Sequence, residues 1–299
     1  MTPALTNRIP YVAAPDRPTL RLPGDARLAV WVIVNVEEWR IDRPMPRTVL
    51  PPPMGQPLLP DVPNWAWHEY GMRAGFWRQH AALVARDIPA TLAINGHVCD
   101  SYPRVAGAAL DAGWEFMGHG WLQGPMHRVE DQRAEIARAC ERIAQFTGKP
   151  VRSWESPGLT ETDETLDHLR AAGVEYVSDW VIDDLPQQID TPHGVITTIP
   201  YTVEINDITV FALQNHRAEE FFERGCAQAL RLHSEGAEVC PRVMAISIHP
   251  YITGVPHRIE ALERLLDFVA GLDGVTWMTA SQIGDWYCAE MARLSTRQE

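Results

Sequence analysis

Two adjacent carboxylates follow the most apolar run of the sequence. Residues 28–36, LAVWVIVNV, have the composition of a buried strand, and Glu37 and Glu38 come directly after it. Successive side chains of a regular strand point to opposite faces, so both glutamates can lean the same way only where the backbone turns. Two neighbouring carboxylates repel each other unless a cation or a shared proton neutralises them. The pair therefore indicates a site for a cation or for proton transfer. The plainer alternative is a Glu38 that points to water.

Other predicted strands also end in polar residues. The carboxyl ends of parallel strands gather at one rim of a barrel, where catalytic groups are usually found. Six successive strands that end in this way predict one shared mouth. Besides the two glutamates, the residues concerned are Asn95, His97, His119, Glu155, Ser156, Asp179 and His249.

The elements that must position these residues alternate between strands and helices. Strands are predicted at 28–36, 88–96 and 114–120, and the alternation continues to a strand at 275–280 and a last helix that Thr279 caps. Strands separated by helices of this length indicate a parallel sheet. We predict an α/β fold, a distorted (β/α) barrel of seven or eight mostly parallel strands in a single domain over residues 1–299. A doubly wound open sheet is the alternative.

Two segments lie outside this alternation. Residues 1–26 are predicted to form an N-terminal extension. Residues 41–63 contain eight prolines, a density that neither a helix nor a strand tolerates. We therefore expect a long ordered loop at the barrel mouth, serving either as a lid or binding loop or as a contact between subunits.

Composition and charge narrow the classes of partner. The formal net charge is −13 and the basic residues are scattered, which argues against nucleic acid and against an anionic membrane surface. The five cysteines are widely separated and form no CxxC pair, as expected for reduced thiols in the cytoplasm. We find neither a signal peptide nor an apolar stretch long enough to span a bilayer. The sequence thus predicts a cytoplasmic protein, and the 11 tryptophans and the proline-rich loop favour a homo-oligomer, a dimer or tetramer.

The residues near the predicted mouth could hold a divalent metal ion. One carboxylate and two imidazoles form an open catalytic site that leaves a position for water. Glu38, His119 and His127 are the candidate ligands, with His127 reaching back across GWLQGPM at 120–126. An isolated loop histidine is more often a surface residue, so this alternative stays open for His127.

At these residues the sequence resembles the polysaccharide deacetylase superfamily, whose fold is a distorted (β/α) barrel. The resemblance covers roughly residues 28–285. NVEEW is similar to a motif in which the first acidic residue is the catalytic base and the second a metal ligand, and GHGW carries His119 at the place of the first metal histidine. SPG, YVSDW and SIHP resemble three later motifs. HEYGMRAGFWR, IDDLP and IPYTVEIND are closer to the branch of allantoinases and cyclic-imide hydrolases.

The sequence departs from the family pattern at three places. Four residues beyond His119, where the second metal histidine is expected, stands Gln123. Either His127 replaces that ligand, Gln123 binds weakly, or no metal binds tightly. Glu155 stands where sugar deacetylases have an arginine, and Trp39 replaces a glycine and should narrow the pocket. These changes argue against an open groove for a polymer.

The resemblance implies hydrolysis of a C–N bond in a small cyclic imide, ureide or related amide by metal-activated water. It implies one divalent ion, zinc by preference, with Glu37 as general base and His249 as general acid, its tautomer set by Asp179 or Asp183. Arg73 could bind a substrate carbonyl or pair with Glu69. A sugar de-N-acetylase and a binding barrel without catalysis are the alternatives. The candidate substrate contacts are Trp39, Arg73, Asn95, Trp121, Glu155 and Asp183.

Overall fold

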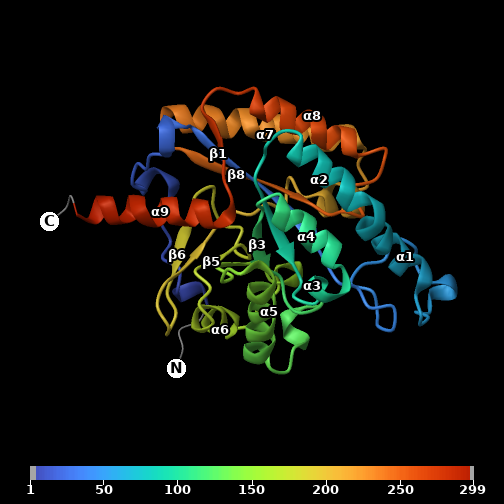
Figure 1. The fold of residues 1–299 in the computed structure, drawn as a ribbon. Helices are drawn as coiled ribbons and strands as arrows, with labels where there is room; N and C mark the ends of the chain where they lie inside the picture. The colour runs from blue at the N-terminus through green and yellow to red at the C-terminus, as the bar shows by residue number, and fades with distance from the viewer. Residues whose placement is uncertain (1–4, 297–299) are drawn as a thin grey trace.

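The computed structural model describes residues 5–296, and a curled, mostly parallel sheet forms a distorted barrel at its centre (Figure 1). Eight strands follow the order β6-β7-β5-β4-β3-β2-β1-β8, and β9 pairs with β1 beside them. The pair β6–β7 is antiparallel and the other pairs are parallel. The predicted α/β barrel is therefore confirmed. The strands are β1 (Leu28–Val36), β2 (Ala90–Ile94), β3 (Glu115–Gly118), β4 (Ser153–Trp154), β5 (Tyr176–Val177), β6 (Gln187–Ile189), β7 (Ile196–Thr198), β8 (Arg242–Ile248) and β9 (Val275–Trp277).

Helices cover the outside of this sheet and connect its strands. The long pair α7 and α8 packs over β1 and β8, whereas α5 and α6 lie at the opposite side of the molecule (Figure 1). The helices are α1 (Val62–Tyr70), α2 (Phe76–Val84), α3 (Val98–Ser101), α4 (Pro103–Asp111), α5 (Gln132–Thr147), α6 (Thr165–Ala171), α7 (Ala218–Glu238), α8 (Ile259–Ala270) and α9 (Ala280–Ser295).

Strand β1 is buried along its whole length, which explains its continuous apolar sequence. Val30, Val32 and Val34 pack into the cluster shared with the outer helices, whereas Trp31 and Ile33 alternate with them and fill the interior. The interior cluster also contains Ile283 and Trp286 of α9. Helix α9 starts after Thr279, the predicted cap, which forms a capping box with Gln282, and the apolar face of α9 closes one end of the barrel.

A segment without regular strand structure, which follows β7 and contacts β8, closes the sheet into a barrel. After β7 the chain runs on to residues 205 and 206, where the Ser247 N–H of β8 donates to the Ile205 carbonyl at 3.0 Å. Asn206 and Ser247 form an isolated parallel bridge. The barrel is thus completed by a short backbone contact instead of a full strand, and that contact places residue 207 beside the end of β8.

Two glycines allow α1 and α2 to lie against the end of β8. A π-helical turn, Gly71–Gly75, joins the two helices. A Cβ atom on Gly75 would stand 2.0 Å from the Pro250 carbonyl oxygen, and one on Gly71 would stand 2.6 Å from the Tyr251 nitrogen. This close backbone approach fixes the position of residues 249–251.

The proline-rich loop is irregular, apart from a 3-10 turn at Pro53–Gly55, until α1 begins at Val62. Asn64 holds it through hydrogen bonds from the backbone of Val49 and Leu50 to the side-chain oxygen, at 2.7 and 3.0 Å. Several apolar side chains of this segment are exposed, including Met54, which is 100% accessible.

The N-terminal extension, described from residue 5, is anchored to the barrel. Its Leu20 and Leu22 are buried in the interior cluster. Arg8 is buried and pairs with both carboxylate oxygens of Asp167 in α6. Within residues 5–296, no helix has both the length and the apolar character needed to cross a bilayer. All five cysteines are free thiols.

Candidate active site

Residues from the carboxyl ends of β1, β3 and β8 meet at one rim of the barrel. Glu37, His119 and His249 are each at most 6% exposed. They lie close enough to interact electrostatically, because His249 lowers the pKa of both Glu37 and His119. The sequence predicted a shared mouth for these three residues, and the structure brings them together.

Glu37 is held by two side-chain donors and lies beside an imidazole. Gln123 Nε2 donates to Oε1 at 2.9 Å, and Trp39 Nε1 donates to Oε2 at 2.6 Å. His249 Nε2 is 3.7 Å from Oε1. Burial raises the pKa of Glu37 above its ordinary value, and His249 and the Trp39 hydrogen bond partly oppose that rise. These contacts leave a buried carboxylate with a fixed orientation, as a general base requires.

His249 is oriented by Asp207, which is fully buried. Asp207 Oδ1 lies 2.7 Å from His249 Nδ1, and Oδ2 accepts from the His249 N–H at 2.7 Å and from the Thr253 hydroxyl at 2.6 Å. A carboxylate only accepts, so Nδ1 carries a proton and Nε2 faces Glu37. The result is a line of carboxylate, imidazole and carboxylate.

The sequence assigned this orienting role to Asp179 or Asp183, and the structure corrects that assignment. Asp179 is buried, but it accepts from the Ser156 N–H at 2.7 Å. It also faces Glu161, and burial together with the Asp179 charge raises the pKa of Glu161 to about 10. Asp183 pairs with Arg17 of the N-terminal extension and accepts from the Leu185 N–H. Neither aspartate hydrogen-bonds to His249.

Glu38 points to partners different from those of Glu37. Its Oε2 accepts from the Ser101 hydroxyl at 2.5 Å, and its Oε1 is 3.6 Å from His97 Nδ1. Its backbone N–H donates to Asn95 Oδ1 at 2.7 Å. The repulsion between the adjacent carboxylates is thus relieved by separation at the strand end, where the chain turns away from β1.

His119 has one ring nitrogen engaged and one free. Nδ1 lies 2.7 Å from the Glu155 carbonyl oxygen, which can only accept, so Nδ1 donates. Nε2 is buried and has no partner among residues 5–296. Burial lowers the pKa of His119 to about 4, and the imidazole is therefore neutral at pH 7.

The residues present do not fit the metal ion that the family implies. A neutral imidazole with a free Nε2 is suitable for one ligand. However, His127 is exposed on the 3-10 turn Met126–Arg128, Gln123 is engaged with Glu37, and Glu38 is turned to Ser101. In the described part of the chain, no group of three His, Cys, Asp or Glu side chains could hold a metal. The predicted ligand set Glu38, His119 and His127 is not assembled.

The predicted substrate contacts divide into two groups. Trp39, Trp121 and Glu155 lie at the rim, and burial with the charges of Asp179 and Glu37 raises the pKa of Glu155 well above its usual range. Asn95 is buried and engaged with the backbone of Glu38 and His119 and with Gln123, so it has a structural role.

Arg73 lies outside the site. Its side chain is 74% exposed and pairs with Glu69 at 2.6 Å, which was the alternative interpretation of the sequence. Asp183 is also engaged elsewhere, with Arg17.

Sequence reasoning missed two residues of the site. Asp207 stands at the end of IPYTVEIND, a segment noted only for its likeness to the allantoinase branch. His68 opens HEYGMRAGFWR, is 1% exposed and stacks on Trp39 with 4.6 Å between the ring centroids. Burial lowers the pKa of His68 to about 3, so it is a neutral aromatic support. In both cases the available signal was a polar residue at one terminus of a family-like segment, His68 at the start of the first and Asp207 at the end of the second.

A groove of about 860 Å³ lies beside the site. Glu38, Gln123 and Trp121 form part of its wall, and the Arg138 guanidinium is 3.6 Å from the tryptophan ring centroid. Its remaining lining comes from Arg40, His97, the start of the proline-rich loop and residues 122–135, including Arg43, Pro44, Pro46, Arg128 and Glu135.

Comparisons with known proteins agree with this fold. Residues 68–177 match the family model of polysaccharide deacetylases. A putative polysaccharide deacetylase of Schizosaccharomyces pombe is 27% identical over 74% of this chain and 75% of its own length. The crystal structure of PuuE allantoinase has a TM-score of 0.82 at 26% identity, covering 91% of this chain and 94% of the other.

A probable polysaccharide deacetylase from Pseudomonas aeruginosa PAO1 has a TM-score of 0.83 at 27% identity, with 92% and 95% of the two chains covered. The chain is thus similar over residues 68–177 to the polysaccharide deacetylase family model, and over most of its length to proteins named as polysaccharide deacetylases and as an allantoinase.

Proposed function

We propose that this protein hydrolyses a C–N bond in a small cyclic imide, ureide or related amide. The observation that carries the proposal is the line formed by Glu37, His249 and Asp207, with 3.7 Å and 2.7 Å between successive partners. The likeness to PuuE allantoinase supports a ring amide as the substrate. Trp39 and its neighbour His68 narrow the space above Glu37, which favours a small planar group.

In the proposed reaction, Glu37 removes a proton from the water that attacks the carbonyl carbon. Glu37 passes this proton to His249 Nε2, 3.7 Å away, and Nε2 delivers it to the departing nitrogen as the C–N bond breaks, which leaves a carboxylic acid and the N–H group of an amide, urea or amine. Asp207 stabilises the imidazolium that forms in between. Trp39 and Gln123 hold Glu37 in place through this proton transfer.

Zinc stays a prediction from the resemblance, and no step above depends on it. Metal analysis of the purified protein, together with assays in the presence of a chelator, tests this prediction directly. Stoichiometric zinc that is lost together with activity on chelation would support it. Activity that survives removal of the metal would contradict it.

A hydrolysis screen over succinimide, hydantoin, allantoin and dihydropyrimidines, with N-acetylglucosamine oligomers alongside, tests the proposed function. We expect turnover of at least one ring amide and none of the oligomers. The Glu37→Gln variant serves as the control, because it keeps the size of the side chain but removes the base. Absence of hydrolysis together with thermal stabilisation by one of these compounds would instead indicate a binding barrel without catalysis.

A sugar de-N-acetylase is the second candidate function. The relatives from Schizosaccharomyces pombe and Pseudomonas aeruginosa carry deacetylase names, and the 860 Å³ groove is larger than a ring amide needs. Release of acetate from the oligomers without turnover of any ring amide would establish this candidate and overturn the first.

A further inference from the structure

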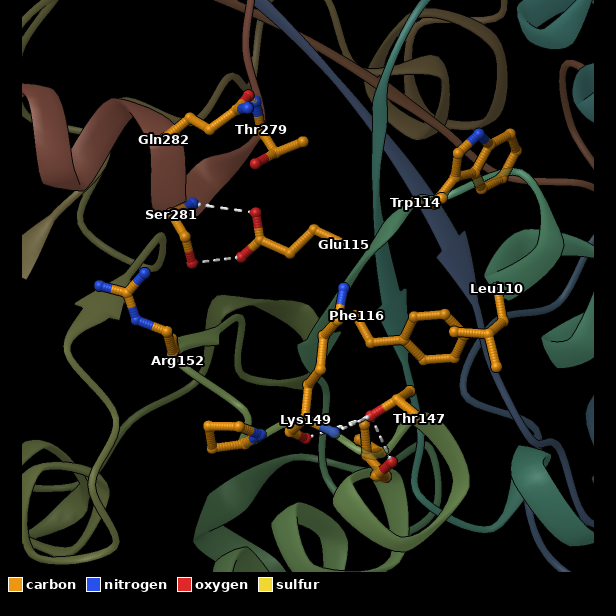
Figure 2. A pocket seen from close by; sticks show the side chains of 13 residues that line it. Leu110, Trp114, Glu115, Phe116, Thr147, Lys149, Arg152, Thr279, Ser281 and Gln282 are labelled. Atoms are coloured by element: carbon orange, nitrogen blue, oxygen red, sulfur yellow. Dashed lines mark hydrogen bonds between the residues drawn. The ribbon is translucent and has the colours of Figure 1, made fainter.

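A second cavity lies at the end of the barrel away from the candidate active site. It has a volume of about 340 Å³, within the range of roughly 300–1,000 Å³ that is typical of small-molecule sites. It opens where β3 and β4 begin, whereas His119 and Glu155 follow the carboxyl ends of the same strands. Its lining is Leu110, Gly113, Trp114, Glu115, Phe116, Ile143, Thr147, Lys149, Pro150, Arg152, Thr279, Ser281 and Gln282 (Figure 2).

One wall of the cavity is apolar. Phe116 is 8% exposed and Ile143 is fully buried, and Leu110 of α4 continues the surface beside the phenyl ring. Figure 2 shows the Phe116 ring pointing toward Leu110, on the side of the cavity away from Arg152. An aryl or short alkyl group placed against this wall would be removed from water, which is favourable.

The polar groups that could accept a hydrogen bond are already engaged. Glu115 receives the Ser281 N–H at 2.9 Å and the hydroxyls of Ser281 and Ser153, each at 2.6 Å. The Thr147 hydroxyl accepts from the Lys149 N–H, and Gln282 Oε1 accepts from the Thr279 N–H. A cationic ligand would therefore find few free acceptors here.

Two cationic residues, Arg152 and Lys149, line the cavity, and they differ in their partners. Arg152 forms ion pairs with Glu175 and Asp285, each at 2.6 Å, so its guanidinium is neutralised. Lys149 is an exposed residue whose ammonium has no hydrogen bond or ion pair with residues 5–296, and its side chain extends toward Phe116 (Figure 2). An uncompensated cation beside an apolar wall matches an anion with an apolar body.

We propose that this cavity binds a small carboxylic acid, with its carboxylate on Lys149 and its apolar body against Phe116, Leu110 and Ile143. The site lies at the opposite end of the strands from the candidate active site, and it does not depend on the function proposed above. Lys149 takes no part in that reaction, so its substitution leaves the hydrolytic rate unchanged.

The sequence offers a selective probe, because Lys149 is its one lysine. Reductive methylation with ¹³C-formaldehyde labels Lys149 and the terminal α-amino group, and it keeps the charge of both amines. We expect benzoate to shift the Lys149 methyl signal in a saturable manner while the α-amino signal stays in place. Benzamide, which has the same shape without the charge, should leave both signals unmoved. Equal and unsaturated shifts of both signals with benzoate would overturn the proposal.

Calorimetry on unlabelled protein gives the second test. Replacing Lys149 with Met removes a charge-assisted contact and should weaken benzoate binding about tenfold or more. The Lys149→Arg variant should retain most of the affinity. Unchanged melting temperatures of both variants would show that the fold is intact. Benzoate affinity unaffected by Lys149→Met would place the ligand elsewhere and refute this site.

Discussion

At the scale of single residues, the tautomer of His249 depends on Asp207. The carboxylate accepts from Nδ1 at 2.7 Å and is itself fixed by the His249 N–H and by Thr253. An amide in its place could donate to Nδ1, which would leave the proton on the wrong nitrogen and remove the charge that stabilises the imidazolium.

We therefore expect Asp207→Asn to lower kcat by about 10²–10⁴-fold, the usual contribution of an acid–base group. The measurement is kcat on whichever ring amide the screen identifies. Asp183→Asn is the matched control, because Asp183 pairs with Arg17 and does not contact His249. Equal losses in the two variants would argue against the role given to Asp207.

The pH dependence of the reaction follows from the environment of Glu37. Burial raises the pKa of this carboxyl, and the hydrogen bond from Trp39 lowers it. A general base acts in its ionised form, so kcat/KM falls as the pH falls through this pKa. In Trp39→Phe the donor is lost, and the pKa of Glu37 should rise further.

The acid limb of the kcat/KM profile of Trp39→Phe should consequently move to higher pH. Trp67→Phe is the control, because Trp67 packs edge-on against Trp39 at 6.4 Å between centroids without a hydrogen bond to Glu37. An unmoved acid limb in Trp39→Phe would mean that another group sets it.

The sequence could predict which residue types reach the rim but not how they pair. Glu37, His119 and His249 were found because each follows an apolar strand. The pairing of Asp207 with His249 depends on the bridge between Asn206 and Ser247, a contact between segments 41 residues apart that carries no local signal. The opposite orientations of Glu37 and Glu38 likewise result from side-chain donors supplied by other elements.

At the scale of elements, the π-helical turn between α1 and α2 fixes the position of His249 at the end of β8 through its contact with residues 250 and 251. Gly75 lies so close to the Pro250 carbonyl that a Cβ atom would stand 2.0 Å from its oxygen. Neither atom belongs to a flexible side chain, so an added methyl group must displace backbone.

We expect Gly75→Ala to lower both the melting temperature and kcat, with a loss of stability of about 1–3 kcal/mol or more from overpacking. Gly107→Ala in α4 is the control, because no atom lies within 4 Å of its added Cβ. That change should leave kcat unaltered and stabilise the helix by up to about 1 kcal/mol. Retention of full stability in Gly75→Ala would contradict the close contact.

The strands and helices themselves were largely predictable. The strand predicted at 28–36 matches β1, and the helix predicted near the end does begin after Thr279. The two π-helical turns, Gly71–Gly75 and Ile208–Leu213, were not foreseen. ITVFAL at 208–213 is rich in β-branched and aromatic residues and GMRAG at 71–75 contains two glycines, so neither composition indicates a helix, and the i→i+5 geometry arises from packing against other segments.

At the scale of the whole molecule, the proline-rich loop presents an exposed apolar surface. Val49, Leu50, Met54, Leu58 and Leu59 are each more than half exposed. Apolar side chains gathered in one segment often mark a contact with another chain. We propose that a second copy of the protein covers this loop in a homo-oligomer.

The combined substitution of Met54, Leu58 and Leu59 by Ser should therefore lower the molar mass measured by light scattering to that of a monomer. Leu213→Ser with Leu230→Ser is the matched control, since these leucines are 62% and 50% exposed outside the loop. A wild-type protein that is already monomeric would refute the proposal.

The buried Arg8 has a consequence for any shortened form of the chain. It pairs with Asp167, and its charge also lowers the pKa of Glu161, which faces Asp179 beneath the rim. Deleting the first eight residues would leave a carboxylate of α6 without its cation and would strengthen the repulsion below Ser156. Such a deletion would therefore destabilise the end of the barrel that carries the candidate active site.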